Sequence, residues 1–291
     1  MENSKNTFNI CNNIFAIQRI VNPQNKNIMN FENEMPMFSH DSCFDFWNRG
    51  KPCSNCISMR ALNENISFSK VENVDGKLYL IIAAPINLNE KRYVVELVKD
   101  ISNDTLYSSY IGKTPSELNA EISRLNELAI KDPLTDTYNR RFLDEQIPCS
   151  LHKYTNYDSS LSLIIMDLDK FKAINDSFGH ICGDYVLKKV SYLLKEYVSN
   201  YNGRICRYGG DEFVILVENI SKSKAYEIAN DLKDIIYNHN FSYNNIHLDV
   251  SCSFGVSFVN RDNNLGLDFE NILNIADMEL LQAKKNRNKV L

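Results

Sequence analysis

The most informative segment of this chain is Arg207-Tyr208-Gly209-Gly210-Asp211-Glu212-Phe213, which places two glycines and two carboxylates between apolar runs. Ile205 and Cys206 precede it and Val214 to Val217 follow it, a pattern that predicts a strand, a tight turn and a buried strand. Glycines let the backbone approach a phosphate, and Asp211 and Glu212 offer the hard oxygen ligands that Mg²⁺ prefers. The segment suits a metal-bound triphosphate, although a four-residue match alone fits a solvated hairpin equally well.

Composition limits the class of protein. With 291 residues and 44% hydrophobic residues, the chain is long enough for two domains and a connector. A net charge of -5 argues against a general nucleic-acid binder. No apolar run approaches the roughly 20 residues that span a bilayer, and the N-terminus is polar, so we expect a cytoplasmic protein without a membrane span. Its eight cysteines are then expected to be mostly free thiols.

The first hundred residues predict a small α+β unit of short strands. Asp75-Gly76 is a hairpin-turn signal between two of them. The predicted strands are Ile14–Ile20, Ile66–Val71, Leu78–Ala84 and Tyr93–Val98. The closing segment, Tyr93 to Ser102, resembles the last strand and exit motif of PAS sensor domains, a match that rests mainly on strand order. This resemblance implies a PAS-like sensor domain over residues 1–112.

A helix is predicted from Ser116 to Lys131, after the start signal Thr114-Pro115. Apolar residues recur along it at spacings of four, three and four: Leu118, Ile122, Leu125 and Ala129. Such a seam predicts a dimerising, signalling linker helix over residues 113–131, held between two domains. The alternative is a single helix that packs on its own domain.

From Asp132 onward, helices and strands alternate, which predicts a domain of about 160 residues with a mixed sheet. The predicted helices are Arg140–Gln146, Asp184–Tyr197, Lys222–His239 and Phe269–Lys285. The predicted strands are Leu161–Met166, the two strands of the hairpin around Gly209-Gly210, and Leu248–Val259.

Four further segments stand in one order with the heptapeptide: Asp132 to Arg141, Asp167 to Asp176, Gly179 to Asp184 and Ser253 to Val256. Together they closely resemble the GGDEF family of diguanylate cyclases over residues 132–291. Several motifs in order are far more specific than any one of them. The resemblance implies an α+β, nucleotidyl-cyclase or palm-like fold with a central, mostly antiparallel sheet flanked by helices. It implies a nucleotidyltransferase that condenses two GTP into cyclic di-GMP plus two pyrophosphates.

The resemblance also implies a two-metal site for Mg²⁺ or Mn²⁺. Asp167 ends an apolar strand, which puts its carboxylate at a sheet edge facing the hairpin. The expected metal ligands are Asp167, the Leu168 carbonyl, Asp211 and Glu212. Asp211 and Glu212 are the expected catalytic residues, with Asp211 as the proton acceptor. The alternative role for Asp167 is a helix N-cap.

The substrate site is expected around the same residues. Asn175 and Asp184 match the family's guanine-reading residues, and Asp184 would face an acceptor on adenine, which favours GTP over ATP. Phe171 and Lys172 match a loop that wraps the phosphates, although Phe171 also fits a core position and Lys172 a solvated one. The expected site is completed by Gly209 and Gly210.

The last helix is expected to bring Lys284 and Arg287 to the β- and γ-phosphates. Here the chain departs from the family, because the segment from Lys284 to Asn288 is one residue short and lacks a glycine, and Leu281 stands where the family usually has Tyr. The position of Arg287 is therefore open, and Lys285 is an alternative to Lys284.

A second departure concerns regulation. Many members carry an Arg-x-x-Asp product-inhibition site that begins nine residues before the first glycine of the signature. In this chain those positions hold Asn200 and Gly203, and Arg204 is one place off. We therefore expect weak or absent product inhibition, unless a one-residue insertion has shifted this loop.

The first domain contains a cysteine cluster, Cys43, Cys53 and Cys56, with His40 just before it. Three interpretations stay open: a metal site for Zn²⁺ or an iron–sulfur cluster, a thiol–disulfide switch, or structural thiols. Cys11 is a further candidate ligand. If the domain is PAS-like, an apolar pocket near Phe68, Leu80 and Ile82 could instead hold a small ligand or haem, although such residues are more often core.

These patterns predict a homodimeric, Mg²⁺-dependent, sensor-gated diguanylate cyclase, since its bond-forming geometry requires two GTP-loaded sites that face each other. One alternative is a catalytically degenerate domain that binds GTP or cyclic di-GMP as a regulator. Another is a redox or metal sensor whose output is a protein contact.

Overall fold

The computed structural model describes residues 14–32, 35–47, 50–104, 114–156, 159–262 and 268–287. The chain divides into two compact units, residues 1–129 and 130–291. Within the described ranges, no helix combines the length and hydropathy of a transmembrane segment.

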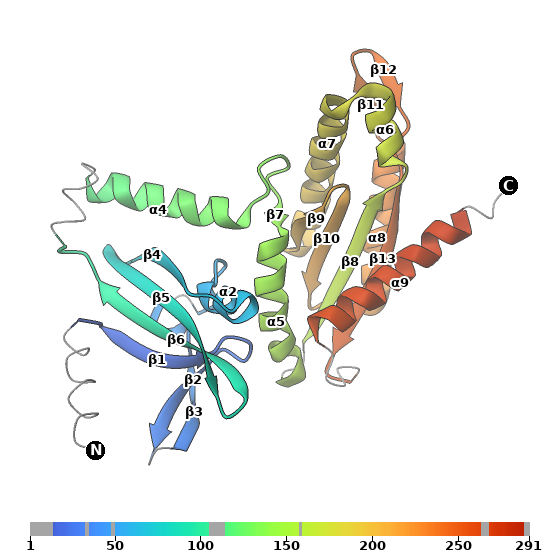
Figure 1. Ribbon diagram of the computed structural model, residues 1–291. Helices are drawn as coiled ribbons and strands as arrows, with labels where there is room; N and C mark the ends of the chain where they lie inside the picture. The colour runs from blue at the N-terminus through green and yellow to red at the C-terminus, as the bar shows by residue number, and fades with distance from the viewer. Residues whose placement is uncertain are drawn as a thin grey trace. The chain divides into compact units, whose positions relative to one another are not determined.

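The first unit is built on a six-stranded antiparallel sheet in the order β3-β2-β1-β6-β5-β4 (Figure 1). Its strands are β1 (Ile17–Asn22), β2 (Asn27–Glu32), β3 (Met35–Ser42), β4 (Phe68–Val74), β5 (Lys77–Leu88) and β6 (Lys91–Asp100). The first strand pairs with the last, with Ile20 opposite Val95. The sequence patterns predicted no strands in the polar, cysteine-bearing stretch after Ile20, because the asparagines of β2 obscure any alternation. In the structure this stretch forms β2 and β3.

A short 3-10 helix, η1 (Asp45–Trp47), and helix α2 (Ile57–Glu64) lie on one face of this sheet. Their buried residues Trp47, Ile57 and Ala61 pack with Ile81 and Val98 of the strands. The polar C-terminal end of α2 closes with Asn65 in the left-handed conformation, at φ 55°. The core of the first unit therefore lies between α2 and the sheet.

The residues proposed for an apolar ligand pocket lie on two faces of the sheet. Phe68 pairs with Ala83 and packs with the core that α2 covers, whereas Leu80 packs with Leu78 and Ile122 in a separate cluster. Side chains directly opposite each other across strands share a face, and neighbours along a strand alternate. Leu80 and Ile82 are therefore on the face opposite Phe68, and the three do not line one pocket.

Helix α4 (Pro115–Ile130) packs along one side on the first unit. Ile122 is buried against Leu78 and Ile101, whereas Leu125 and Leu128 are 52% and 55% exposed. In the predicted apolar seam, Ile122 therefore packs on its own domain, as the alternative interpretation of this helix has it. Leu125 is exposed. The side chain of Leu118 lies outside the described residues.

The second unit contains a five-stranded sheet in the order β13-β8-β10-β9-β7. Only the β7–β9 pair is parallel among the described strands of this sheet, which confirms a mostly antiparallel arrangement. The strands are β7 (Tyr138–Asn139), β8 (Ser160–Leu168), β9 (Arg204–Gly209), β10 (Glu212–Glu218) and β13 (Cys252–Asn260), with a separate hairpin of β11 (Phe241–Tyr243) and β12 (Ile246–Leu248).

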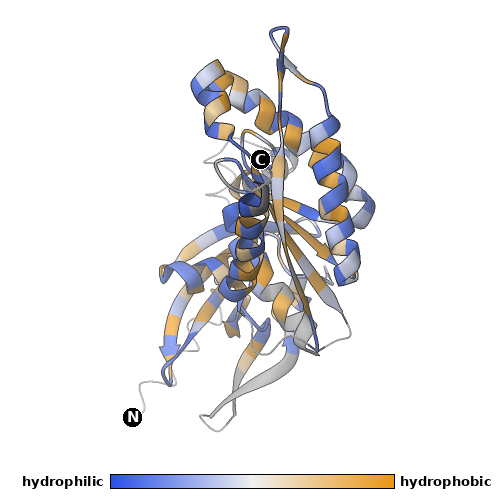
Figure 2. Ribbon diagram, turned by 90° about the vertical axis from the view of Figure 1, so that its right-hand side faces the viewer, coloured by the Kyte–Doolittle hydropathy of each residue, from blue (hydrophilic) through white to orange (hydrophobic). Residues whose placement is uncertain are grey.

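Helices flank this sheet, as expected for an α+β domain. They are α5 (Arg140–Asn156), α6 (Phe171–Phe178), α7 (His180–Val198), α8 (Lys222–Asn238) and α9 (Phe269–Arg287), with the 3-10 turn η2 (Ser199–Tyr201). Figure 2 shows hydrophobic and hydrophilic colours mixed around the long helices. That is the distribution of helices that bury one side.

Two local predictions for the second unit are wrong. Phe171 and Lys172 begin helix α6 instead of lying in a loop, because Lys170, at φ 56°, reverses the chain directly after β8. The strand predicted over Leu248–Val259 begins too early. Leu248 is the last residue of β12, residues 249–251 connect the two strands, and β13 begins only at Cys252.

Candidate active site

Strand pairing brings three carboxylates to one edge of the sheet. In the antiparallel β8–β10 ladder, Asp167 lies directly opposite Glu212. Asp211 precedes Glu212 in the turn, and its carbonyl accepts a hydrogen bond from the Leu168 amide at 3.4 Å. The sequence predicted that these residues meet, and the ladder places them together.

The turn itself is held by Arg207, a role that the sequence patterns did not assign. Gly210 adopts φ 52°, and its carbonyl accepts hydrogen bonds from Nε and Nη2 of Arg207 at 2.9 and 2.8 Å. The Nη1 of the same guanidinium donates to both carboxylate oxygens of Asp132, at 3.2 and 3.3 Å. Arg207 therefore ties the glycine turn to the start of the domain.

Asp132 is itself fixed by its neighbour. The hydroxyl and the amide of Thr135 donate to Asp132 Oδ1 at 2.7 and 2.9 Å. Burial alone would raise the pKa of Asp132, but these hydrogen bonds and the Arg207 guanidinium lower it below its ordinary value. Asp132 therefore stays ionised and keeps Arg207 in place.

The electrostatics of the carboxylate edge favour a bound cation. Burial, and next the charge of Asp167, raise the pKa of Asp211, and the same two causes raise the pKa of Glu212. Lys284 opposes both shifts. Carboxylates gathered in a half-buried site raise one another's pKa, and a bound cation opposes this effect.

Lys284 supplies a cation at this edge in the structure. Its Nζ donates to Asp167 Oδ1 at 2.7 Å, so Asp167 is ion-paired and Lys170, not Asp167, is the N-cap residue of α6. Lys285 is exposed, which leaves Lys284 as the lysine that reaches the site. Arg287 is the last residue of α9, and its side chain lies outside the described residues.

Helix α9 reaches the site because β13 lets it approach closely. A Cβ at Gly255 would lie 2.0 Å from the Ala276 carbonyl oxygen and 2.5 Å from the Leu280 amide nitrogen. Glycine is therefore required for the backbones of β13 and α9 to touch. This contact fixes the line of the helix along which Lys284 projects.

The residues present fit Mg²⁺ or Mn²⁺ by their chemistry, because carboxylate and carbonyl oxygens are the preferred ligands. In the described part of the chain, no three Cys, His, Asp or Glu side chains are close enough to form a metal cage by themselves. Mg²⁺ at nucleotide sites is usually held by one or two carboxylates plus substrate phosphates, so a complete protein cage is not required.

Asp169 is a second residue that the sequence patterns missed. Its carboxylate accepts hydrogen bonds from the hydroxyls of Ser251, at 3.1 Å, and Ser253, at 2.8 Å. Its amide donates to the Ser251 carbonyl at 2.8 Å. Asp169 thus joins the end of β8 to β13. The Asp-x-Asp repeat of Asp167 and Asp169 was the available signal.

The two expected guanine-reading residues come from neighbouring helices, Asn175 from α6 and Asp184 from α7. A Cβ at Gly183 would lie 1.9 Å from Asn175 Oδ1, so the amide packs directly on the residue before Asp184. Asp184 is exposed and Asn175 is half-buried. Phe171 is buried and Lys172 is exposed.

A cavity adjoins the carboxylate edge between α6 and β12. Its walls include Asp167, Asp169 and Lys284 on one side and Phe178 and His247 on the other. It provides room for a ligand next to Asp167, whereas Asp211 and Glu212 are not part of its lining.

The product-inhibition positions stay without an arginine–carboxylate pair. Asn200 lies in η2, and Gly203 is in the tight turn before β9, where a Cβ would lie 2.4 Å from Val198. Arg204 is ion-paired with Glu218 of β10. The one arginine near the expected register is therefore engaged within the sheet.

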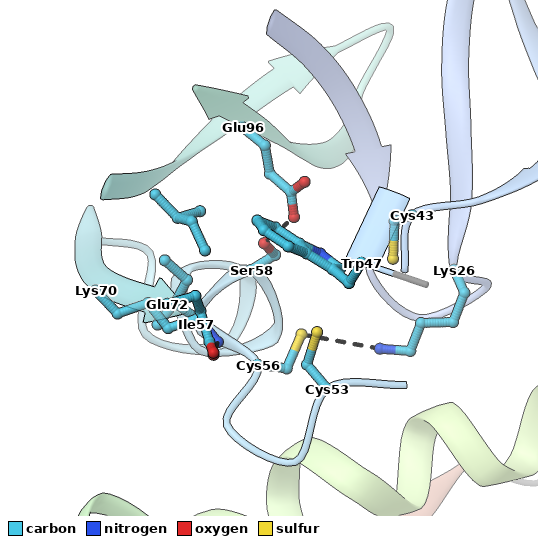
Figure 3. Close-up of a pocket in the computed structure, with 11 residues that line it drawn as sticks. Lys26, Cys43, Trp47, Cys53, Cys56, Ile57, Ser58, Lys70, Glu72 and Glu96 are labelled. Carbon is cyan, nitrogen blue, oxygen red and sulfur yellow. Dashed lines mark hydrogen bonds and ion pairs between the residues drawn. The ribbon is translucent and has the colours of Figure 1, made fainter. Parts of the chain in front are cut away.

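In the first unit, Cys43, Cys53 and Cys56 line one small cavity (Figure 3). All three are thiols. They do not form a metal-binding group with other described Cys, His, Asp or Glu side chains. Cys11 and the side chain of His40 lie outside the described residues.

A family model described as "Diguanylate cyclase, GGDEF domain" matches residues 129–289, more than half of the chain. The chain belongs to the GGDEF family. Diguanylate cyclase DosC of Escherichia coli is 32% identical over 222 residues, which are 76% of this chain and 46% of DosC. This GGDEF chain thus spans about half the length of the curated relatives it matches.

Two solved structures share the fold of the GGDEF unit. The coiled coil and GGDEF domain of DgcB from Caulobacter crescentus, in complex with c-di-GMP, has a TM-score of 0.56 and 20% identity, and covers 64% of this chain and 95% of its own. Diguanylate cyclase SiaD from Pseudomonas aeruginosa, in complex with its activator SiaC, has a TM-score of 0.52 and 27% identity, with 64% and 68% covered.

Proposed function

We propose that this chain is a diguanylate cyclase that condenses two GTP into cyclic di-GMP and two pyrophosphates as a homodimer gated by its N-terminal unit. The observation that carries the proposal is the meeting of Asp167, Asp211 and Glu212 at one sheet edge, with Lys284 Nζ 2.7 Å from Asp167. The family match and the GGDEF relatives support the same reaction.

Each group at the edge has a defined task in this proposal. Asp167, Asp211, Glu212 and the Leu168 carbonyl hold Mg²⁺, which when bound activates the attacking 3′-hydroxyl and neutralises phosphate charge. Asp211 accepts the proton. Lys284 binds the phosphates as a point charge, and the rotation of its long side chain lets it exchange carboxylate for phosphate.

The two helices α6 and α7 select the base. The Asn175 amide, which packs on Gly183, and the Asp184 carboxylate offer a donor and acceptors to the guanine edge. Adenine would leave the Asp184 carboxylate against an acceptor, which costs binding free energy when the site is closed.

The dimer follows from the chemistry, since each protomer would hold one GTP and bond formation needs two loaded sites face to face. We propose α4 as the dimerising and signalling helix over residues 113–131, with a PAS-like sensor over 1–112 and the catalytic domain over 132–291. The exposed Leu125 and Leu128 support this role for α4.

The test is incubation of the purified chain with GTP and Mg²⁺, followed by chromatographic detection of cyclic di-GMP. We expect product from the wild type and at least about a 100-fold loss in Asp211→Asn, which keeps the shape of the side chain but cannot accept the proton. Asp176→Asn, on the exposed side of α6, is the matched control and should retain activity.

Absence of product from both reduced and untreated wild type, with GTP binding intact, would instead favour the degenerate regulatory domain. This alternative is tested because the segment from Lys284 to Arg287 is shorter than the family pattern.

A further inference from the structure

The cavity of the first unit combines thiols with buried cations. Cys43, Cys53 and Cys56 line it together with Lys26 and Lys70. In Figure 3 the sulfur atoms of Cys53 and Cys56 lie beside the dashed line that runs to the Lys26 ammonium. Lys26 is itself buried, although lysine is one of the residues least often found inside a protein. The contacts around each thiol distinguish the roles of the three cysteines.

Cys56 has the environment of a reactive thiol. It is the N-cap of α2, and its Sγ accepts a hydrogen bond from the Met59 amide at 3.5 Å. The Lys26 ammonium donates to the same sulfur at 3.9 Å. A helix N-terminus and a neighbouring ammonium both stabilise a thiolate, which is the nucleophilic form of cysteine.

Cys53 and Cys43 differ from Cys56 in these contacts. Cys53 stands three residues before Cys56, the spacing of dithiol motifs, and its side chain is the least buried of the three. Burial raises the pKa of Cys53 and, with Lys26 opposing it, that of Cys43. Cys43 comes from the segment after β3 and has no such spacing to a second cysteine.

The loop between Cys53 and Cys56 is joined to helix α4. Asn55, only 6% exposed, donates from Nδ2 to Asn126 Oδ1 of α4 at 2.8 Å. The Asn55 carbonyl accepts from Lys70 Nζ at 2.5 Å, and its Oδ1 accepts from Arg60 at 2.7 Å. Asn55 is thus held by three hydrogen bonds, and a movement of the loop would change its bond to α4.

We propose that Cys53 and Cys56 form a reversible dithiol–disulfide pair, with Cys56 as the attacking thiol and Cys53 as the resolving thiol, and that Asn55 transmits the change to Asn126 of α4. The oxidant is a low-molecular-weight disulfide. Control of GTP turnover by this pair rests on the proposed function; the thiol chemistry does not.

The exchange balances as follows. The Cys56 thiolate attacks one sulfur of the disulfide, which breaks its S–S bond, expels one thiolate and forms a mixed disulfide. Cys53 then gives up its proton and attacks Cys56 Sγ, which expels the second thiolate and forms the Cys53–Cys56 bond. Two protons and two electrons pass from the protein to the two released thiols.

Closing this bond constrains the loop, because a disulfide fixes the separation of the two Cβ atoms at about 3.5 to 4.5 Å and sets the dihedral angle about the S–S bond. The three contacts of Asn55 resist any movement that this constraint requires. The bond to Asn126 is the one that connects the loop to α4.

The first experiment treats the reduced full chain with oxidised glutathione and maps the cysteines by mass spectrometry after alkylation. We expect a Cys53–Cys56 disulfide in the wild type and in Cys43→Ser, and a glutathione mixed disulfide on Cys56 in Cys53→Ser. In Cys56→Ser, Cys53 should react with glutathione disulfide at least about tenfold more slowly than Cys56 does in Cys53→Ser. Serine keeps the N-cap acceptor, so Cys56→Ser retains the helix.

Three outcomes would overturn the proposal. Glutathione could attach to Cys43 in preference to Cys56, or Cys53→Ser could accumulate no mixed disulfide. The reduced chain could also carry a stoichiometric metal whose chelation is needed before the thiols react. Each identifies a different use of the cavity.

The second experiment measures amide hydrogen exchange in α4 for the reduced and the oxidised chain, without GTP. We expect oxidation to change exchange near Asn126 several-fold in the wild type and in Ser123→Ala, an exposed control on the same helix, and to leave Asn126→Ala unaffected. Unchanged exchange in oxidised wild type contradicts the transmission. Because this readout needs no turnover, a chain that lacks cyclase activity does not alter its meaning.

Discussion

Asp211 and Glu212 are kept in a half-buried cluster where each carboxylate destabilises the other. Burial and the charge of Asp167 raise the pKa of Asp211 in the folded chain, whereas an unfolded chain has the ordinary value of 3.8. The folded chain therefore binds more protons between these two values, and the free energy of unfolding decreases as the pH rises through that interval. The charged form that catalysis needs is the less stable form of the free protein.

This balance predicts that Asp211→Asn stabilises the protein without ligands. At about pH 7 we expect the free energy of unfolding to rise by at most about 1 kcal/mol, because the site is partly exposed and solvent screens the charges. The gain should shrink as the pH falls toward 3.8, where the carboxyl becomes protonated. Chemical denaturation over a pH series measures this. Asp176→Asn removes a charge from an exposed site and serves as the control; a gain independent of pH would contradict the argument.

At the scale of elements, the contact between α6 and α7 shapes the proposed base site. Gly183 is the residue of α7 that allows it, since an added Cβ would lie 1.9 Å from Asn175 Oδ1 and 3.1 Å from the ring of Phe171. An alanine at position 183 must displace the Asn175 amide, whereas it raises the helix propensity of that position. The cost should therefore appear in nucleotide binding more than in stability.

We predict that Gly183→Ala weakens GTP binding by about 5- to 100-fold, the range for loss of one or two hydrogen bonds to a buried polar group. A double-mutant cycle with Asn175→Ala tests the cause. Once Asn175 is truncated, the added methyl has no amide to displace and only the ring of Phe171 close by, at 3.1 Å, so the double variant should bind GTP nearly as Asn175→Ala does. Additive losses, measured by calorimetry, would show that Gly183 acts by another route.

At the scale of the whole molecule, the proposed function makes α4 the connection between a sensor in the first unit and the dimer. Ile122 of this helix packs on the first unit, whereas Leu125 and Leu128 are exposed. A second copy of the helix is the partner that the proposed function assigns to these leucines. Dimerisation and sensing would then use different residues of one helix.

The combined variant Leu125→Glu and Leu128→Glu should therefore shift the protein to monomers in sedimentation velocity. Turnover per protomer at low protein concentration should fall by about tenfold or more, because two active sites no longer meet. Ser123→Glu adds a charge at an exposed polar position of the same helix and should retain the dimer. A double variant that stays dimeric and active would remove α4 from the interface.

The sequence by itself determined the class of the second unit and most of its carboxylates. The order of the motifs and the continuous apolar runs predicted β8, β9 and β10, and they placed Asp167 at a sheet edge facing the hairpin, where the structure sets it opposite Glu212. These features are local or follow from pairing rules, which is why patterns along the chain could predict them.

Only the tertiary structure decided which partners these residues meet. The clamp from Arg207 to Asp132 joins positions 75 residues apart, and the choice of Lys284 over Lys285 depends on how Gly255 lets α9 approach β13. In the first unit, the sequence placed Cys53 and Cys56 together but could not show that Asn55 between them is bonded to Asn126. Contacts of this kind depend on the packing of segments distant in the chain, which no local period records.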